Sequence, residues 1–191
     1  PWHDFGLTKD KQVGGTIWRD EKPAYYGKSI APLTFEDAFS ASGTVAFHSA
    51  GSDSGVYFGF FDAASKSNKW TYDHQAQQTN LLTIAIEGPS RIGHYFRAGY
   101  RNAKGEGMLE ESGPTIKPDG ATHHWSMRNN PKGKDADGEI VVTFDDHKQT
   151  TRVRKEDKAG GGRFDRFGIV NMQTGGHHVE FYLNQLQFTG N

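Results

Sequence analysis

The sequence contains no cysteine among its 191 residues. Disulfide bonds, thiolate nucleophiles and cysteine-ligated zinc sites are therefore excluded, although this absence does not assign a cellular compartment. No stretch approaches the 18 consecutive apolar residues of a membrane-spanning helix, so we expect no membrane insertion. The chain begins at Pro1 without an initiator methionine. We expect a processed or trimmed chain, which leaves secretion open.

An excess of charge of one sign is also missing. Lys and Arg together number 22, Asp and Glu together number 23, and the formal net charge is −1. Nucleic acids and anionic membranes are bound largely through excess positive charge, so we expect neither as a partner. The chain has no phosphate-binding P-loop and no Gly-x-Ser-x-Gly nucleophile elbow, so nucleotide-dependent functions are not expected.

Glycine and aromatic residues, in contrast, are abundant. The chain has 24 glycines and 13% aromatic residues, and its glycine share is nearly twice the usual share of about 7%. Short apolar runs separated by turn signals favour strands over helices. We predict strands over residues 43–48, 55–61, 81–87, 94–101, 123–128, 139–145, 149–155, 167–172 and 178–188. Residues 32–40 and 63–78 are expected to form loops with local turns.

The spacing of these strands predicts the fold class. Many short strands with frequent turn signals are typical of an all-β, antiparallel, two-sheet β-sandwich of the jelly-roll kind. No internal repeat and no linker is visible, so we expect one domain over residues 1–191, with residues 1–32 wrapping its edge.

Alternation along the strands separates a core side from an outward side. The core side is predicted to carry Val45, Phe47, Phe96, Ala98, Tyr100, Trp125, Met127, Val179, Phe181, Leu183 and Gln185. The outward side is predicted to carry His48, Tyr95, Arg97, Arg101, His124, Arg128, His178, Glu180 and Tyr182. If these strands lie in one sheet, the outward residues line one shallow concave surface. The alternative is a plain polar exterior with these residues scattered over both sheets.

One turn offers candidate metal ligands. The segment 135–139, which reads DADGE, holds carboxylates of the kind that calcium prefers. Asp135 and Asp137 are therefore candidate calcium ligands, and a solvated hairpin tip without a metal is the alternative. His178 and Glu180 share a strand face and could bind a transition metal together, but two ligands do not complete a site.

Three segments carry a resemblance to a known family. Residues 124–128 (HWSMR), 138–146 (GEIVVTFDD) and 167–186 are similar to the concanavalin A-like lectin/glucanase (laminin-G-like) sandwiches. In that family a Trp-containing strand, a strand ending in an Asp-rich turn and a closing Phe-Tyr-Leu-Asp-Asp-Leu strand recur. Here Asn184 and Gln185 replace the acidic pair. The resemblance covers roughly the C-terminal two thirds of the chain, and it implies this sandwich fold and a glycan as ligand or substrate.

A shorter segment resembles a family of enzymes on the same fold. Residues 95–102, which read YFRAGYRN, are similar to the Tyr-Phe-Lys-Ala-Gly-x-Tyr-x-Gln strand of alginate-lyase-type polysaccharide lyases. The resemblance implies that Tyr95 and Arg97 face the cleft. The companion Gln-Ile-His and Arg-x-Glu-Leu-Arg strands of those lyases are absent from this chain.

The outward residues include the types that a lyase needs. β-Elimination at a uronate requires a neutralised carboxylate, a base for the C5 proton and an acid for the leaving oxygen. The hypothesis assigns Arg97 and Arg128 to the carboxylate, His124 or His178 to the base, and Tyr182 or Tyr95 to the acid. Glycoside hydrolysis would need two carboxylates facing one cleft, and the Glu-x-Asp-x-x-Glu strand of the family is absent.

Because no complete catalytic motif is present, the sequence favours a non-catalytic module that binds a polysaccharide or oligosaccharide. Its expected ligand-binding residues are His48, Tyr95, Arg101, Arg128 and Glu180. We expect it outside the cell or in a periplasm, alone or within a longer multidomain chain. The first alternative is a lyase that cleaves a uronate-containing glycan with Arg97, His124, His178 and Tyr182 as catalytic residues. The second is an adhesion or scaffold domain without a glycan ligand.

Overall fold

A computed structural model describes residues 2–67, 78–87, 94–111, 113–133 and 137–190. The described strands form two sheets, and every pairing between strands is antiparallel. Sheet A has the order β1 (Asp4–Leu7), β2 (Val13–Trp18), β14 (His178–Gly190), β4 (Phe39–Ala50), β10 (Thr122–Asn130), β11 (Glu139–Phe144) and β12 (His147–Arg152). Sheet B has the order β3 (Tyr25–Leu33), β13 (Phe164–Asn171), β5 (Gly55–Phe61), β6 (Leu81–Glu87), β7 (His94–Arg101) and β8 (Gly107–Leu109), and β9 (Thr115–Ile116) pairs with β7. The predicted two-sheet antiparallel sandwich is confirmed.

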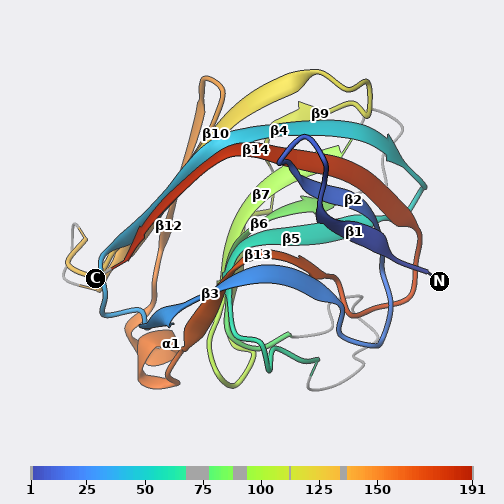
Figure 1. Cartoon of the computed structure of the whole chain (residues 1–191). Coiled ribbons are helices and arrows are strands. Elements are labelled where there is room, and N and C mark those ends of the chain that lie inside the picture. The colour runs from blue at the N-terminus through green and yellow to red at the C-terminus, as the bar shows by residue number, and fades with distance from the viewer. Residues whose placement is uncertain (1, 68–77, 88–93, 112, 134–136, 191) are drawn as a thin grey trace.

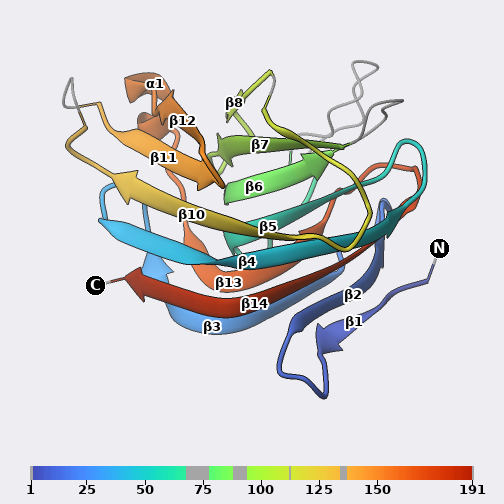
Figure 2. The same cartoon turned by 90° about the horizontal axis from the view of Figure 1, so that it is seen from above.

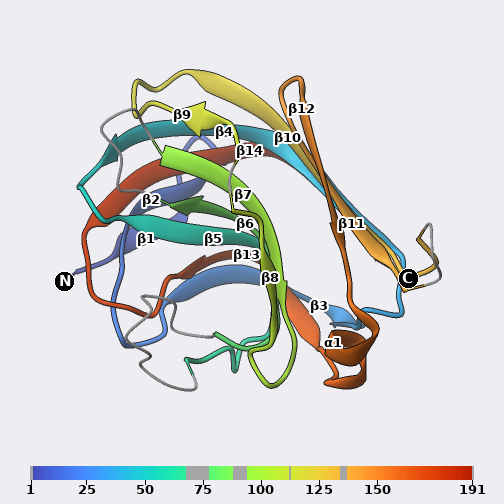
Figure 3. The ribbon, with the colours of Figure 1, turned by 180° about the vertical axis from the view of Figure 1, so that it is seen from behind.

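The two sheets are curved in the same sense. Sheet A arches over sheet B in Figure 1, and the view from behind in Figure 3 shows the same nesting. The view from above shows β10, β4 and β14 side by side across sheet A (Figure 2). The side of sheet B that points away from sheet A is therefore concave, and the free side of sheet A is convex. We call the outward residues Tyr57, Thr83, Glu87, Tyr95, Arg97 and Arg101 of sheet B the concave face. We call the outward residues His48, His124, Arg128, Glu180 and Tyr182 of sheet A the convex face.

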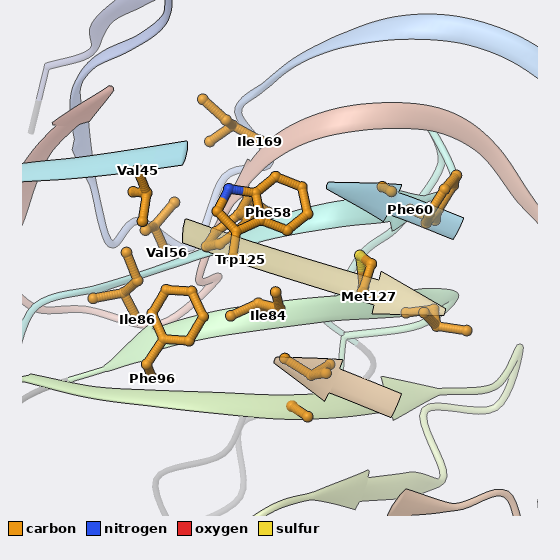
Figure 4. Packing of buried hydrophobic residues seen from close by; sticks show 14 of the residues in the cluster. Val45, Val56, Phe58, Phe60, Ile84, Ile86, Phe96, Trp125, Met127 and Ile169 are labelled. Atoms are coloured by element: carbon orange, nitrogen blue, oxygen red, sulfur yellow. The ribbon is translucent and has the colours of Figure 1, made fainter. Parts of the chain in front are cut away.

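Apolar side chains of alternate residues fill the space between the sheets. Phe58 of sheet B packs edge-on against Trp125 of sheet A, with ring centroids 5.1 Å apart, and also contacts Phe96 (Figure 4). Ten of the residues predicted to face the core are buried, which confirms the strand parity for them: Val45, Phe47, Phe96, Ala98, Tyr100, Trp125, Met127, Val179, Phe181 and Leu183. This single core fixes which side of each strand points outward.

Gln185 is an exception, because the prediction that it faces the core is wrong. It is exposed and its backbone has a φ of 52°. The β14–β4 register moves from Asn184 opposite Thr44 to Gln187 opposite Ser42, so β14 carries a β-bulge. The bulge inserts residues into one strand and changes which side later residues face.

A row of small residues crosses sheet B. The register places Gly168 opposite Gly59, Gly59 opposite Thr83, and Thr83 opposite Gly99. A Cβ on Gly168 would overlap the carbonyl oxygen of Tyr26, and one on Gly59 would lie 2.8 Å from the carbonyl oxygen of Leu82. Glycine within a strand permits such close backbone approach and a bend of the strand. The row therefore helps to produce the concavity of sheet B.

The N-terminal residues 2–33 contribute edge strands: β1 and β2 extend sheet A, and β3 borders sheet B. Of the segments expected to be loops, residues 34–38 connect β3 to β4, whereas residues 68–77 lie outside the described part. No helix among the described residues is long and apolar enough to span a membrane.

The predicted strand over residues 149–155 ends early, at Arg152, and the helix α1 (Lys155–Ala159) follows. The buried side chain of Asp157 explains this turn of the chain. Its Oδ2 accepts a hydrogen bond from Tyr100 Oη at 2.6 Å and another from Arg154 Nε at 2.7 Å. The contact with Tyr100, 57 residues away in the sequence, helps to fix a helix where the sequence pattern predicted the end of a strand.

Candidate functional site

The outward residues predicted to share one surface lie on two opposite sides of the sandwich. Tyr95, Arg97 and Arg101 belong to β7 and to the concave face of sheet B. His48, His124, Arg128, His178, Glu180 and Tyr182 belong to β4, β10 and β14 of sheet A. The prediction of a single shared surface is therefore wrong, because parity gives the side of a strand but not the sheet to which the strand belongs.

On the concave face, three adjacent strands bring polar and aromatic side chains together. Arg97 of β7 lies opposite Ala85 of β6, and Ala85 lies opposite Tyr57 of β5. In the next row, Glu87 of β6 lies opposite Tyr95 of β7. Sequence reasoning missed Tyr57 because both sides of β5 are apolar or aromatic, so that parity gives no outward side. The phenol oxygen, the one polar side-chain atom in GVYFGFF, was the available signal.

Arg97 is held by partners from two directions. Its Nη2 forms an ion pair with Glu87 Oε2, and the two side chains are 15% and 17% exposed. Its Nη1 donates to the carbonyl oxygens of Glu110 at 3.3 Å and Glu111 at 3.4 Å. The Arg97 charge is therefore compensated in this structure. A ligand carboxylate that pairs with Arg97 must compete with Glu87.

Tyr57 lies at the centre of this charged group. Burial and the nearby Glu87 carboxylate raise the pKa of Tyr57 to about 12, while the charges of Arg101, Arg19 and Arg97 act in the opposite direction. The phenol is thus protonated at neutral pH and available as a hydrogen-bond donor. Beside it lies a cavity of about 10 Å³ lined by Tyr57, Thr83 and Arg101 among others. This is at the lower limit of the room that one water molecule needs.

The convex face carries a separate cluster at one end of β14. The rings of His48 and Tyr182 meet edge-on at 5.2 Å, and Tyr182 Oη donates to Glu180 Oε1 at 3.0 Å. Ser49 Oγ donates to the other oxygen of that carboxylate at 3.2 Å. Burial and the Glu180 carboxylate raise the pKa of Tyr182. The His178 ring stacks at a tilt on Trp18, with centroids 5.1 Å apart.

The two predicted bases lie far apart on this convex side. His124 lies level with Asn184 across β4, whereas His178 is six residues earlier on β14. Six residues of a strand span about 20 Å. Both are separated from Arg97 by the full thickness of the sandwich. The structure therefore does not bring Arg97, the first predicted carboxylate-binding arginine, and either predicted base to one substrate. Arg128, exposed on β10, lies on the convex side as well.

The candidate calcium ligands fall partly outside the described residues, because Asp135 is not described. Asp137 forms an ion pair with Arg152, which lowers the pKa of the Asp137 carboxyl. Within the described ranges, no group of three or more His, Cys, Asp or Glu side chains could hold a metal ion. Calcium at this turn stays a prediction.

Comparisons with known proteins identify the fold of this chain. No family model matches the sequence, and no curated protein matches it. Among solved structures, the chain is similar to the carbohydrate recognition domain of Emp47p, with a TM-score of 0.59 and 12% identity over 96% of this chain and 85% of that one. It is also similar to the family 7 alginate lyase A1-II′ in complex with a substrate, with a TM-score of 0.59 and 12% identity over 100% of this chain and 83% of that one. The carbohydrate recognition domain of Emp46p is similar with a TM-score of 0.52 and 13% identity over 94% of this chain and 83% of that one. The chain therefore has the concanavalin A-like jelly-roll fold that the sequence motifs indicated.

Proposed function

We propose that this protein binds a polysaccharide through the concave face of sheet B, as a recognition module. The observation that supports the proposal is the convergence of Tyr57 from β5 with Tyr95, Arg97 and Arg101 from β7, on either side of β6, on the hollow side of a curved sheet. Concave sites with a few fixed polar groups and apolar walls are the usual places for ligands.

The chemistry of these side chains suits a sugar chain. Aromatic rings offer apolar surface for the C–H faces of pyranose rings, and the phenol and guanidinium groups donate hydrogen bonds to hydroxyl or carboxylate oxygens. Arginine binds a carboxylate in a bidentate manner, so an acidic sugar fits this face better than a neutral one. The similar structures include domains described as carbohydrate recognition domains and as alginate lyases, which agrees with a glycan as ligand.

A lyase acting on a uronate-containing glycan is the second candidate. It is favoured by the position of the YFRAGYRN segment, whose first seven residues lie in β7 and place Tyr95 and Arg97 on the concave face. Against it, His124 and His178 lie on the opposite side of the sandwich from Arg97. Binding without cleavage therefore ranks first.

Calorimetric titration with a panel of neutral and acidic oligosaccharides tests the proposal. The variants Arg101→Ala and Tyr95→Ala each remove one contact from the concave face. We expect each to weaken binding of the best ligand by about 10-fold or more, since a hydrogen bond to a charged group contributes about 1.5–3 kcal/mol. Lys22→Ala, at an exposed residue of the segment between β2 and β3, is the control and should bind as the wild type does.

The same samples separate the alternatives. A rise in ultraviolet absorbance from unsaturated uronate products, lost in Arg97→Ala, would establish the lyase. Absence of binding to every member of the panel would remove the proposed function and favour an adhesion or scaffold domain. The proposal also places the protein outside the cell or in a periplasm, which fractionation of the producing cells checks.

A further inference from the structure

A local groove interrupts the convex side of sheet A, where β14 ends. It is an open groove of about 960 Å³ on the free side of sheet A. The strand register sets one row of outward residues across its floor, consisting of Gln187, Ser42, Ser126, Thr143 and Lys148. This row crosses five strands spaced about 4.8 Å apart, so it is about 19 Å long. The groove is thus long enough for an oligosaccharide rather than a single sugar.

Hydroxyl groups form much of the groove floor. Ser126 Oγ and Thr143 Oγ1 lie 2.5 Å apart, and in the neighbouring row Ser40 Oγ and Thr189 Oγ1 lie 2.8 Å apart. A hydroxyl that is paired once keeps further donor or acceptor capacity. The β-bulge at Gln185 completes this floor, because it turns Thr189 outward beside Ser40 and leaves Phe188 stacked on Phe167 between the sheets.

The charged residues that line the groove are all cations: Lys28, Arg128 and Lys148. Lys28 Nζ lies over the Phe188 ring, 5.5 Å from its centroid. No described residue forms an ion pair or hydrogen bond with the side chains of Arg128 or Lys148. Among the residues that the structure describes, the cations of the groove therefore have no acidic partner, although the whole chain has a net charge of −1.

Six other described arginines are matched by acids. Ion pairs hold Arg19, Arg97, Arg152, Arg154, Arg163 and Arg166. An unmatched cation beside a floor of hydroxyls differs from this pattern. It fits a ligand that supplies both anionic groups and hydroxyls.

We propose that this groove, which we call the hydroxyl groove (Ser40, Ser42, Ser126, Arg128, Thr143 and Lys148), binds a segment of an anionic polysaccharide. It does so independently of the concave face. Arg128 and Lys148 are two strands and two residues apart, which places their Cα atoms about 12 Å from each other. Two anionic groups on different sugar units of one chain can pair with them, while the serine and threonine hydroxyls bind the sugar hydroxyls between.

Calorimetric titration of the full chain tests this site with four probes. An oligogalacturonate supplies carboxylates, dextran sulfate supplies sulfates, neutral dextran supplies hydroxyls alone, and a DNA duplex supplies phosphates without the glycan. The double variant Arg128→Ala/Lys148→Ala removes both unmatched charges. Lys9→Ala/Lys22→Ala changes the net charge equally at exposed residues outside the groove and serves as the matched control.

For the anionic glycan that binds, we expect the double variant to weaken one site by about 10–100-fold, whereas the control binds as the wild type does. Ser126→Ala keeps both charges and should weaken the same site by about 2–5-fold. The carboxylate and sulfate arms identify which anion the groove accepts.

Two results would overturn the proposal. One is an isotherm of the double variant that matches the control for both anionic glycans. The other is a DNA duplex that binds as tightly as the glycan and loses its affinity in the double variant, because the groove would then be a general polyanion site. Arg101→Ala separates this site from the concave face: it should leave the groove isotherm unchanged.

Discussion

The curvature of sheet B depends on residues without a side chain, and Gly168→Ala tests this dependence. In the native register Gly168 lies between Gly27 of β3 and Gly59 of β5, and an added Cβ would overlap the carbonyl oxygen of Tyr26. The strands β13 and β3 must then move apart. Overpacking of this kind costs about 1–3 kcal/mol, and each lost backbone hydrogen bond about 1 kcal/mol more. We therefore expect a loss of about 2–4 kcal/mol in the free energy of unfolding.

Thermal unfolding followed by circular dichroism measures this loss. At about 2–4 °C per kcal/mol for a chain of this size, the Tm should fall by about 5–15 °C. Gly175→Ala is the matched control, because a Cβ there meets no atom within 4 Å. A Gly168→Ala protein whose Tm equals that of the control would refute the close backbone approach as the source of the bend.

Three further predictions concern individual side chains. Glu87→Gln removes the ion-pair partner of Arg97, so the variant should bind an acidic oligosaccharide about 5–10-fold more tightly than the wild type does. Its affinity for a neutral oligosaccharide should not change. Equal affinities of variant and wild type for the acidic ligand in calorimetry would contradict this. Burial lowers the pKa of His94, which is paired with Ser54 at 2.9 Å, so its neutral form is favoured on folding. The contribution of His94 to stability is then fully present above the ordinary pKa of 6.5 and falls as the pH drops below it. The urea midpoint of the wild type should therefore fall between about pH 7.5 and pH 5.5, and His94→Gln should reduce this fall. Asp157→Asn weakens the buried hydrogen bonds that anchor α1, and chemical denaturation should show a loss of about 1–3 kcal/mol in the free energy of unfolding. The control Glu156→Gln, at an exposed residue, should show no such loss.

Much of the fold followed from local sequence patterns. Turn residues and strand parity located β4–β7, β10–β14 and most of the core, including Trp125, because the two-residue period of a strand is a local property. The strands β1, β2, β3, β8 and β9 were not predicted. The bulge at Gln185 was missed for the opposite reason. An inserted residue resets the period, and nothing in a strand rich in apolar residues marks where this happens.

The candidate site was harder to predict because it depends on long-range pairing. Arg97 and His124 have the same outward parity, yet β7 and β10 belong to different sheets and their side chains point in opposite directions. Tyr57 was hidden because β5 is almost wholly apolar. The partners of Arg97, namely Glu87 and the carbonyl groups of residues 110 and 111, come from segments whose proximity only the folded sheet reveals.

The most direct test of carbohydrate recognition by the concave face is amide chemical-shift mapping of the labelled protein during titration with an oligouronate. If the concave face binds the glycan, the amide signals of β5, β6 and β7 shift in proportion to ligand occupancy, whether or not signals of the hydroxyl groove shift as well. A saturating titration that leaves the signals of these three strands unchanged would contradict it.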